Sequence, residues 1–185
     1  NLDLTLTLGS GTQFSTIKNK EGNISYFDSQ GRLRKLENNQ STKSAITIDY
    51  ADNTYRITKI TDGAGRVYQF GYYNNFVNRI SYKGSGAKEL AYIAINYTDS
   101  CPIKITYQDS TEDSPKFSQF TYSSKRLLLT AQDIDGYKLT YTYTTQSAGK
   151  PSRVKTVTES HNGETGSSLT LTYAHNQTTF TDNLG

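Results

Sequence analysis

The sequence predicts an all-β protein in which antiparallel hairpins follow one another and form one long, curved sheet. Short runs of β-branched and aromatic residues alternate with polar residues, which is the pattern of strands with one buried face. Clusters of Asp, Asn and Gly, which favour hairpin turns, separate these runs. No window places apolar residues at helical spacing over three turns, so we expect almost no helix.

The composition suits a thin sheet. A chain of 185 residues is long enough to bury the core of one domain, and we expect residues 1–185 to form a single domain. Tyrosine (15 residues) outnumbers phenylalanine (7 residues), and tryptophan is absent. Because tyrosine combines an apolar ring with a hydroxyl that reaches water, we expect tyrosine and aliphatic side chains on one half-buried face and Thr, Ser and Lys on the other.

The charges are balanced and interspersed. The 20 Lys and Arg residues and 17 Asp and Glu residues give a net charge of +3, and no basic block is present that could follow a phosphate backbone. No segment approaches the roughly 20 apolar residues of a membrane-spanning helix. These features argue against nucleic-acid binding and membrane insertion. Because the chain starts at Asn1 and ends at Gly185 within a turn sequence, we expect it to be a piece of a longer protein.

The predicted strands can be taken in chain order. Leu2, Leu4, Leu6 and Leu8 alternate with polar residues and should form the buried face of the first strand. Further alternating runs predict strands at residues 13–18, 23–27, 32–36, 67–70, 137–143 and 168–173. The stretch 45–82 is the best-preserved part of the pattern. Longer hairpin loops are expected at residues 38–43, 109–116 and 145–151.

A repeat becomes visible when the residues after each turn are aligned. The anchors are pairs in which Arg, or once Pro, precedes an aliphatic residue: Arg32-Leu33, Arg56-Ile57, Arg79-Ile80, Pro102-Ile103, Arg126-Leu127 and Arg153-Val154. The intervals between them are 24, 23, 23, 24 and 27 residues, which predicts about six hairpin repeats of roughly 23–24 residues. Six residues before the first three anchors stand Tyr26, Tyr50 and Tyr73, which we expect at equivalent, partly buried positions.

Two kinds of turn are predicted in each repeat. Asp28, Asp52 and Asn75 lie in the turns before the first three anchors. A second kind of turn, which carries an acidic residue and glycine, includes Asp62 with Gly65 and Asp133 with Gly136. Asp and Asn suit such turns because their side chains accept hydrogen bonds from the local backbone, and glycine tolerates a positive φ.

These motifs together resemble the YD repeat of the bacterial RHS and wall-associated proteins and of animal teneurins. The segment Tyr26–Leu33 is the cleanest copy, and the resemblance extends from about residue 22 to residue 185. It departs from the pattern at Cys101-Pro102 and at Ser123-Ser124-Lys125. The resemblance implies a structural repeat motif made of Tyr26, Asp28, Gly31, Arg32, Tyr50, Asp52, Arg56, Asp62, Gly65, Tyr73, Arg79, Tyr97, Tyr122, Arg126, Asp133, Gly136 and Arg153.

The resemblance also implies a function. In that family, arrays of hairpins form a hollow β-shell, and toxin-bearing members enclose a C-terminal toxic domain. The chain would then be a non-enzymatic segment of a bacterial secreted or cell-surface protein, with the neighbouring repeats and the toxin domain of its parent as partners. About six repeats are too few to close a shell, so we expect a curved, open sheet with two unpaired edges. The isolated chain should then either self-associate through these edges or hide them behind loops.

No catalytic, cofactor or metal site is predicted from the residues. His161 and His175 are distant in sequence and have no neighbouring cysteine. Cys101 has no evident base partner, and Asp133 and Asp135 fall in a predicted turn. Two alternatives stay open. One is a module that binds carbohydrate or protein through exposed tyrosines, and the other is a β-rich glycosidase, which would need a cleft with two acids.

Overall fold

The computed structural model describes residues 3–11, 13–39, 45–84, 88–145 and 150–183. This part of the chain forms strands and turns without a helix. The strands are β1 (Thr5–Thr7), β2 (Ser15–Lys18), β3 (Ile24–Phe27), β4 (Leu33–Glu37), β5 (Ile46–Tyr50), β6 (Ile57–Thr61), β7 (Val67–Tyr73), β8 (Phe76–Lys83), β9 (Glu89–Thr98), β10 (Cys101–Asp109), β11 (Lys116–Tyr122), β12 (Leu128–Gln132), β13 (Tyr137–Tyr143), β14 (Val154–His161), β15 (Glu164–Ala174) and β16 (Gln177–Asp182).

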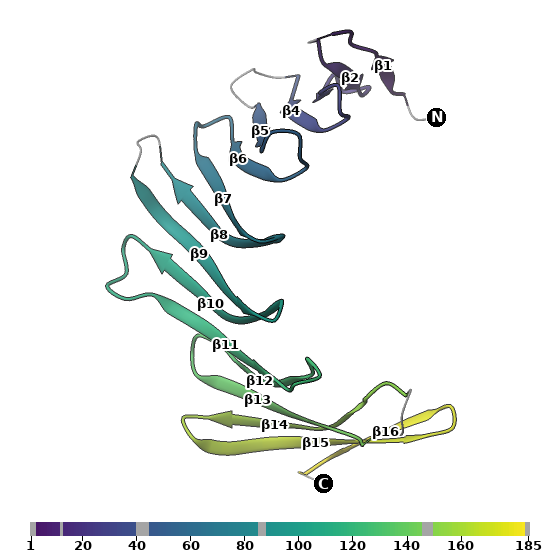
Figure 1. Ribbon diagram of the computed structural model, residues 1–185, viewed down its shortest axis with the longest axis vertical. Helices are drawn as coiled ribbons and strands as arrows, with labels where there is room; N and C mark the ends of the chain where they lie inside the picture. The colour runs from purple at the N-terminus through teal and green to yellow at the C-terminus, as the bar shows by residue number, and fades with distance from the viewer. Residues whose placement is uncertain (1–2, 12, 40–44, 85–87, 146–149, 184–185) are drawn as a thin grey trace. The chain divides into compact units, whose positions relative to one another are not determined.

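The strands follow one another in the sheet in the order in which they occur in the chain, from β1 to β16 (Figure 1). Each strand is hydrogen bonded to the next, and the pairings are antiparallel. The predicted all-β meander of hairpins is therefore confirmed. Within the described residues, no helix has the length and apolar character needed to cross a membrane.

Contacts divide the chain into two compact units, which we describe separately. The first comprises residues 1–94 and 108–113. On one of its faces, Ile48 lies opposite Ile60, Ile60 lies opposite Tyr68, and the row continues across the sheet. The adjacent row on the other face is polar, and Lys59 binds Asp49 there at 2.8 Å. The alternating sequence thus produces the two chemically distinct faces that it predicts.

The second unit comprises residues 95–107 and 114–185 and has a ladder of hydroxyl side chains on its polar face. One row crosses β11 to β15 through Thr121, Thr130, Thr140, Thr158 and Ser168. Hydroxyl groups bond directly between neighbouring strands, at 2.6 Å for Thr121 with Thr130 and 3.1 Å for Thr158 with Ser168. Such cross-strand pairs stabilise a sheet that has no second layer on this face.

Burial is shallow in both units. Ile48, 9% exposed, is the buried hydrophobic residue of the described chain, and none of the described side chains is fully buried. Several large side chains of the apolar face remain exposed, among them Ile46 (36%), Ile93 (38%) and Leu129 (36%). Much of the apolar face is therefore in contact with solvent.

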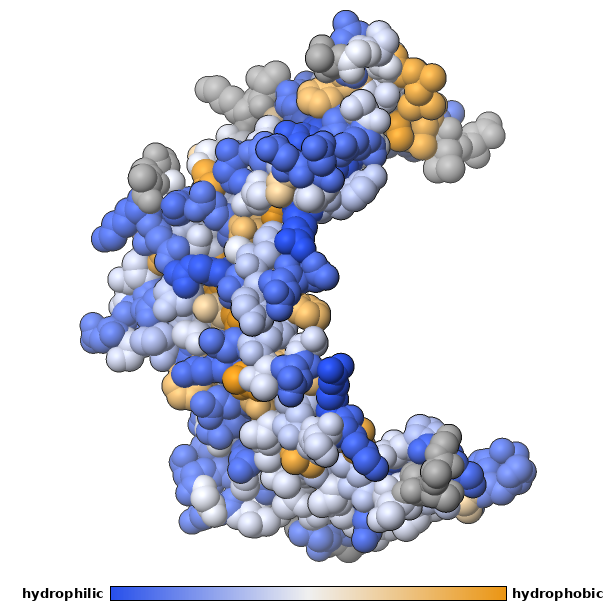
Figure 2. Space-filling model, in the orientation of Figure 1, coloured by the Kyte–Doolittle hydropathy of each residue, from blue (hydrophilic) through white to orange (hydrophobic). Residues whose placement is uncertain are grey.

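The first strand departs from the prediction. Leu4, Leu6 and Leu8 were expected to be buried, but they are 52%, 62% and 78% exposed. Within the described residues, β1 is only three residues long and pairs with β2 alone, at the edge of the sheet. Figure 2 shows the resulting apolar surface at the N-terminal end of the molecule. Leu2 lies outside the described residues.

Candidate functional site

One turn geometry accounts for several of the predicted motif residues. Asp28 follows β3, and its Oδ1 accepts hydrogen bonds from the backbone N–H groups of Gln30 and Arg32, each at 3.0 Å. Its Oδ2 accepts a third bond from Nε of Arg32 at 2.8 Å. Gly31 takes the left-handed conformation that the turn requires, with φ at 74°. The carboxylate therefore determines both the turn and the direction of the arginine.

The same geometry recurs at Asp62, Asp133 and Ser123, whose side chains accept bonds from the backbone two and four residues later. Asp28 and Asp62 were assigned to two kinds of turn in the sequence, but the structure gives them one kind. At Ser123, the left-handed position is occupied by Arg126, with φ at 61°. The turn that contains Asp52 differs, because it spans residues 51–56 and Thr54 supplies the accepting side chain.

A second recurring device joins neighbouring strands near these turns. Four tyrosines, which we call the bridging tyrosines, donate a hydrogen bond from their hydroxyl group to a backbone carbonyl of the preceding strand. The bonds run from Tyr50 to Leu33 (3.0 Å), from Tyr72 to Ile57 (2.9 Å), from Tyr143 to Leu128 (2.7 Å) and from Tyr173 to Val154 (2.6 Å). Each bridging tyrosine is half-buried.

Arginines stack on three of the bridging tyrosines. The guanidinium carbon of Arg32 lies 5.1 Å from the ring centroid of Tyr50, and that of Arg56 lies 5.5 Å from the ring of Tyr72. Arg153 lies 5.0 Å from the ring centroid of Tyr173. In each case, the arginine directly precedes the residue whose carbonyl accepts the tyrosine hydroxyl. An Arg-aliphatic pair therefore forms a binding surface for a tyrosine of the next strand.

The predicted equivalence of Tyr26, Tyr50 and Tyr73 is wrong at two positions. The pairing of strands shifts register close to the turn in each of these three hairpins, and the residues just after the shift are equivalent. They pair as Phe27 with Leu33, Tyr50 with Ile57, and Tyr72 with Val77. Tyr26 instead lies opposite Lys35, and Tyr73 is 57% exposed. Counting back six residues from each anchor fails because the turns differ in length. Five, six and four residues lie between the two members of the three pairs, respectively.

Two of the predicted anchors also differ from the others. Arg79 does not follow a turn: it lies within β8 opposite Gly71, with its guanidinium 3.8 Å from the ring centroid of Tyr92. Arg126 is the left-handed turn residue, and Leu128 rather than Leu127 pairs with Tyr122. Tyr97 lies within β9.

The described residues contain no group of three or more His, Cys, Asp or Glu that could hold a metal ion. Cys101 is a half-buried free thiol. The ring of His161 stacks on Tyr137 with centroids 4.0 Å apart, and His175 lies between β15 and β16. The Asp133 carboxylate accepts the N–H group of Asp135, so the acidic pair has a turn role. A groove beside Tyr137, lined by residues of β11 to β14, was not anticipated from the sequence.

Hydrogen bonds lower the pKa of the turn carboxylates. Burial alone would raise the pKa of Asp28, but the backbone and side-chain bonds from Arg32, the backbone bond from Gln30 and the charge of Arg32 outweigh it. The same balance lowers the pKa of Asp62, with Arg66 and Ala64 as donors. At Asp109, bonds from the side chain and backbone of Thr111 lower the pKa against a smaller effect of burial.

These shifts predict acid sensitivity. A carboxyl group with a lowered folded-state pKa contributes stability above its ordinary value of 3.8, and this contribution is lost as the pH falls through the folded-state pKa. We expect the urea midpoint to be constant near neutral pH and to fall below about pH 4. Asp28→Asn should lower the midpoint at neutral pH and flatten its acid dependence. Asp52→Asn, at an exposed turn position, is the control and should keep the wild-type profile.

No protein-family model matches the chain, and no curated protein matches it. Its fold is similar to that of the solved structures of TcdB2-TccC3 (TM-score 0.62), TcdB2-TccC3-Cdc42 (0.63) and TcdB2-TccC3 without its hypervariable C-terminal region (0.64), each at 16% sequence identity. The alignments cover 89% of this chain but only 9 or 10% of the other chains. At this identity, the comparison establishes the fold, and the chain spans about a tenth of each protein that it matches.

Proposed function

We propose that this chain is a segment of the repeat shell of an RHS/YD-repeat protein, and that the complete shell encloses or delivers a C-terminal toxin domain. The observation that carries the proposal is the continuous antiparallel meander. In the alignment with part of TcdB2-TccC3, 89% of the present chain is covered. The recurring turns and bridging tyrosines support it, because they repeat a structural unit along the sheet rather than converge on one point.

The uncovered apolar face suggests how the segment contributes to the shell. An isolated sheet with this much exposed apolar surface is poorly stabilised, so its natural state requires neighbouring repeats at its edges and a covering for its apolar face. We place the apolar face toward the interior of the shell and the hydroxyl-rich face toward water. The role is structural, with the neighbouring repeats and the toxin domain as partners, in a secreted or cell-surface protein.

Footprinting of the full-length parent protein tests this function. Carbene labelling should modify Ile46 and Tyr68, which lie on the apolar face, in the isolated chain but not in the parent. Lys59, on the polar face, is the control and should be labelled in both. A C-terminal domain should resist protease in the intact parent and be digested when it is expressed alone. Equal labelling of Ile46 and Tyr68 in both samples, or equal digestion of the C-terminal domain, would contradict the shell.

A further inference from the structure

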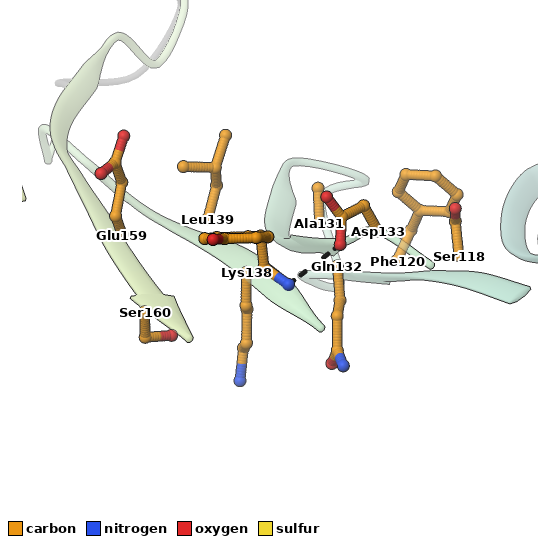
Figure 3. Close-up of a pocket in the computed structure, with 10 residues that line it drawn as sticks. Ser118, Phe120, Ala131, Gln132, Asp133, Lys138, Leu139, Glu159 and Ser160 are labelled. Carbon is orange, nitrogen blue, oxygen red and sulfur yellow. Dashed lines mark hydrogen bonds between the residues drawn. The ribbon is translucent and has the colours of Figure 1, made fainter. Parts of the chain in front are cut away.

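A groove of about 530 Å³ lies on the second unit, near the β12–β13 turn. Its apolar floor comes from Phe120 on β11, Ala131 on β12 and Leu139 on β13, which lie opposite one another in one row of the apolar face. Figure 3 shows these three side chains pointing to the same side of the sheet. The small Ala131 between two large residues creates the hollow. The volume falls within the range of roughly 300–1,000 Å³ that is usual for small-ligand sites.

The polar groups on the groove side are two carboxylates and the hydroxyl group of Ser118 (Figure 3). Glu159 extends the apolar row on β14, opposite Leu139, and Asp133 lies at the end of β12. Glu159 also lies at the register shift between β14 and β15, so it has no directly paired residue on β15. Lys138 also lines the groove, but it points to the opposite side of the sheet (Figure 3). Among the described residues, no Lys or Arg forms an ion pair with Glu159 or Asp133.

An aromatic ring completes the groove. Tyr137 is 58% exposed, although it lies on the apolar face. One face of its ring is covered by His161, with 9° between the ring planes, and His161 is not a lining residue of the groove. Because Tyr137 lines the groove and stays largely exposed despite this stacking, part of its ring remains accessible there. Tyr137 and Glu159 are diagonal neighbours on β13 and β14, and both also line a second hollow of about 210 Å³.

The first unit shows what such a combination binds. The guanidinium of Arg79 lies 3.8 Å from the ring centroid of Tyr92 and donates from Nη2 to Oε1 of Glu89 at 2.6 Å. Ring and carboxylate thus hold one guanidinium group between them, as the electrostatics of both partners favour. The groove contains the same two partners, Tyr137 and Glu159, without an arginine of its own.

We propose that this groove binds the side chain of an arginine from a partner polypeptide. The guanidinium stacks on the exposed face of Tyr137 and donates hydrogen bonds to Glu159, while the aliphatic stem lies on Leu139 and Phe120. Asp133 adds negative charge, although its Oδ1 accepts the N–H groups of Asp135 and Tyr137. Arginine fits better than lysine because its planar head can stack on the ring and bind the carboxylate at the same time. The inference does not depend on the proposed shell.

Titration of the isotopically labelled 185-residue chain with N-acetyl-arginine amide tests the site by NMR. We expect saturable shifts of amide signals at residues 131–139 and 159–166, and weaker binding of N-acetyl-lysine amide. Tyr137→Ala and Glu159→Gln should each weaken the binding about fivefold or more. Glu159→Gln keeps the size of the side chain, so it decides the outcome if Tyr137→Ala disturbs the fold.

Two matched variants serve as controls, Tyr73→Ala at another exposed tyrosine and Glu21→Gln at another exposed acid. Both should bind the arginine derivative with wild-type affinity. The proposal is overturned if shifts do not saturate, if Glu159→Gln binds as well as the wild type, or if a neutral sugar such as N-acetylglucosamine saturates the same signals and the arginine derivative does not. Binding that is unaffected by salt would also contradict it, because an ion pair at an open groove is screened.

Discussion

Replacing Ile48 with alanine is expected to lower the free energy of unfolding of the first unit by about 2–3 kcal/mol. Ile48 is 9% exposed and lies between β4 and β6, opposite Ile60. In a sheet without a second layer, few side chains lose most of their contact with water, so each one that does carries a large share of the apolar stabilisation. Urea unfolding followed by tyrosine fluorescence measures the loss, since the chain has no tryptophan.

Ile46→Ala is the matched control for this variant. Ile46 lies two residues earlier on the same strand and the same face, but it is 36% exposed. We expect it to cost about 1 kcal/mol or less. Equal losses at the two positions would contradict this prediction, because they would show that the burial of Ile48 does not set its contribution to stability apart from that of Ile46.

The second large effect is expected at a bridging tyrosine. Tyr72→Ala removes a half-buried ring, the hydroxyl bond to the Ile57 carbonyl and the surface on which Arg56 stacks. We expect a loss of about 2–3 kcal/mol, of which Tyr72→Phe should reproduce about 1 kcal/mol by removing the hydroxyl bond alone. Urea unfolding of the two variants separates the ring from the hydroxyl group.

The neighbouring tyrosine provides the control. Tyr73 follows Tyr72 in the same strand, but its side chain is 57% exposed and lies on the other face. Tyr73→Ala should change the free energy of unfolding by less than about 0.5 kcal/mol. If Tyr73→Ala destabilised the protein as much as Tyr72→Ala, the bridging role of Tyr72 would be wrong.

The fold class followed from the sequence because its causes are local. Alternation of apolar and polar residues requires only that the strands have two different faces. The turn at Asp28 could be predicted because its carboxylate, Gly31 and Arg32 interact within five consecutive residues. Such short-range chemistry is visible in a single sequence without knowledge of the strand register.

The equivalence of tyrosines and the groove could not be predicted, because both depend on register. Tyr72 bridges and Tyr73 does not because the turn after them is shorter than the turn after Tyr50. Alternation predicts that Leu4, Leu6 and Leu8 share one face, but it cannot reveal that this face is exposed. Glu159 lies in the same row as Leu139, Ala131 and Phe120 only because of the registers of three successive hairpins.

The bridging tyrosines have a consequence for how the chain is made. Their hydroxyl bonds connect residues that are only 15 to 19 positions apart. Each strand also pairs with the next one in the chain, so no hairpin has to wait for a distant segment. During synthesis on the ribosome, or during passage through an export channel, each new hairpin can dock on the one that emerged before it. The meander is thus suited to folding progressively from one end.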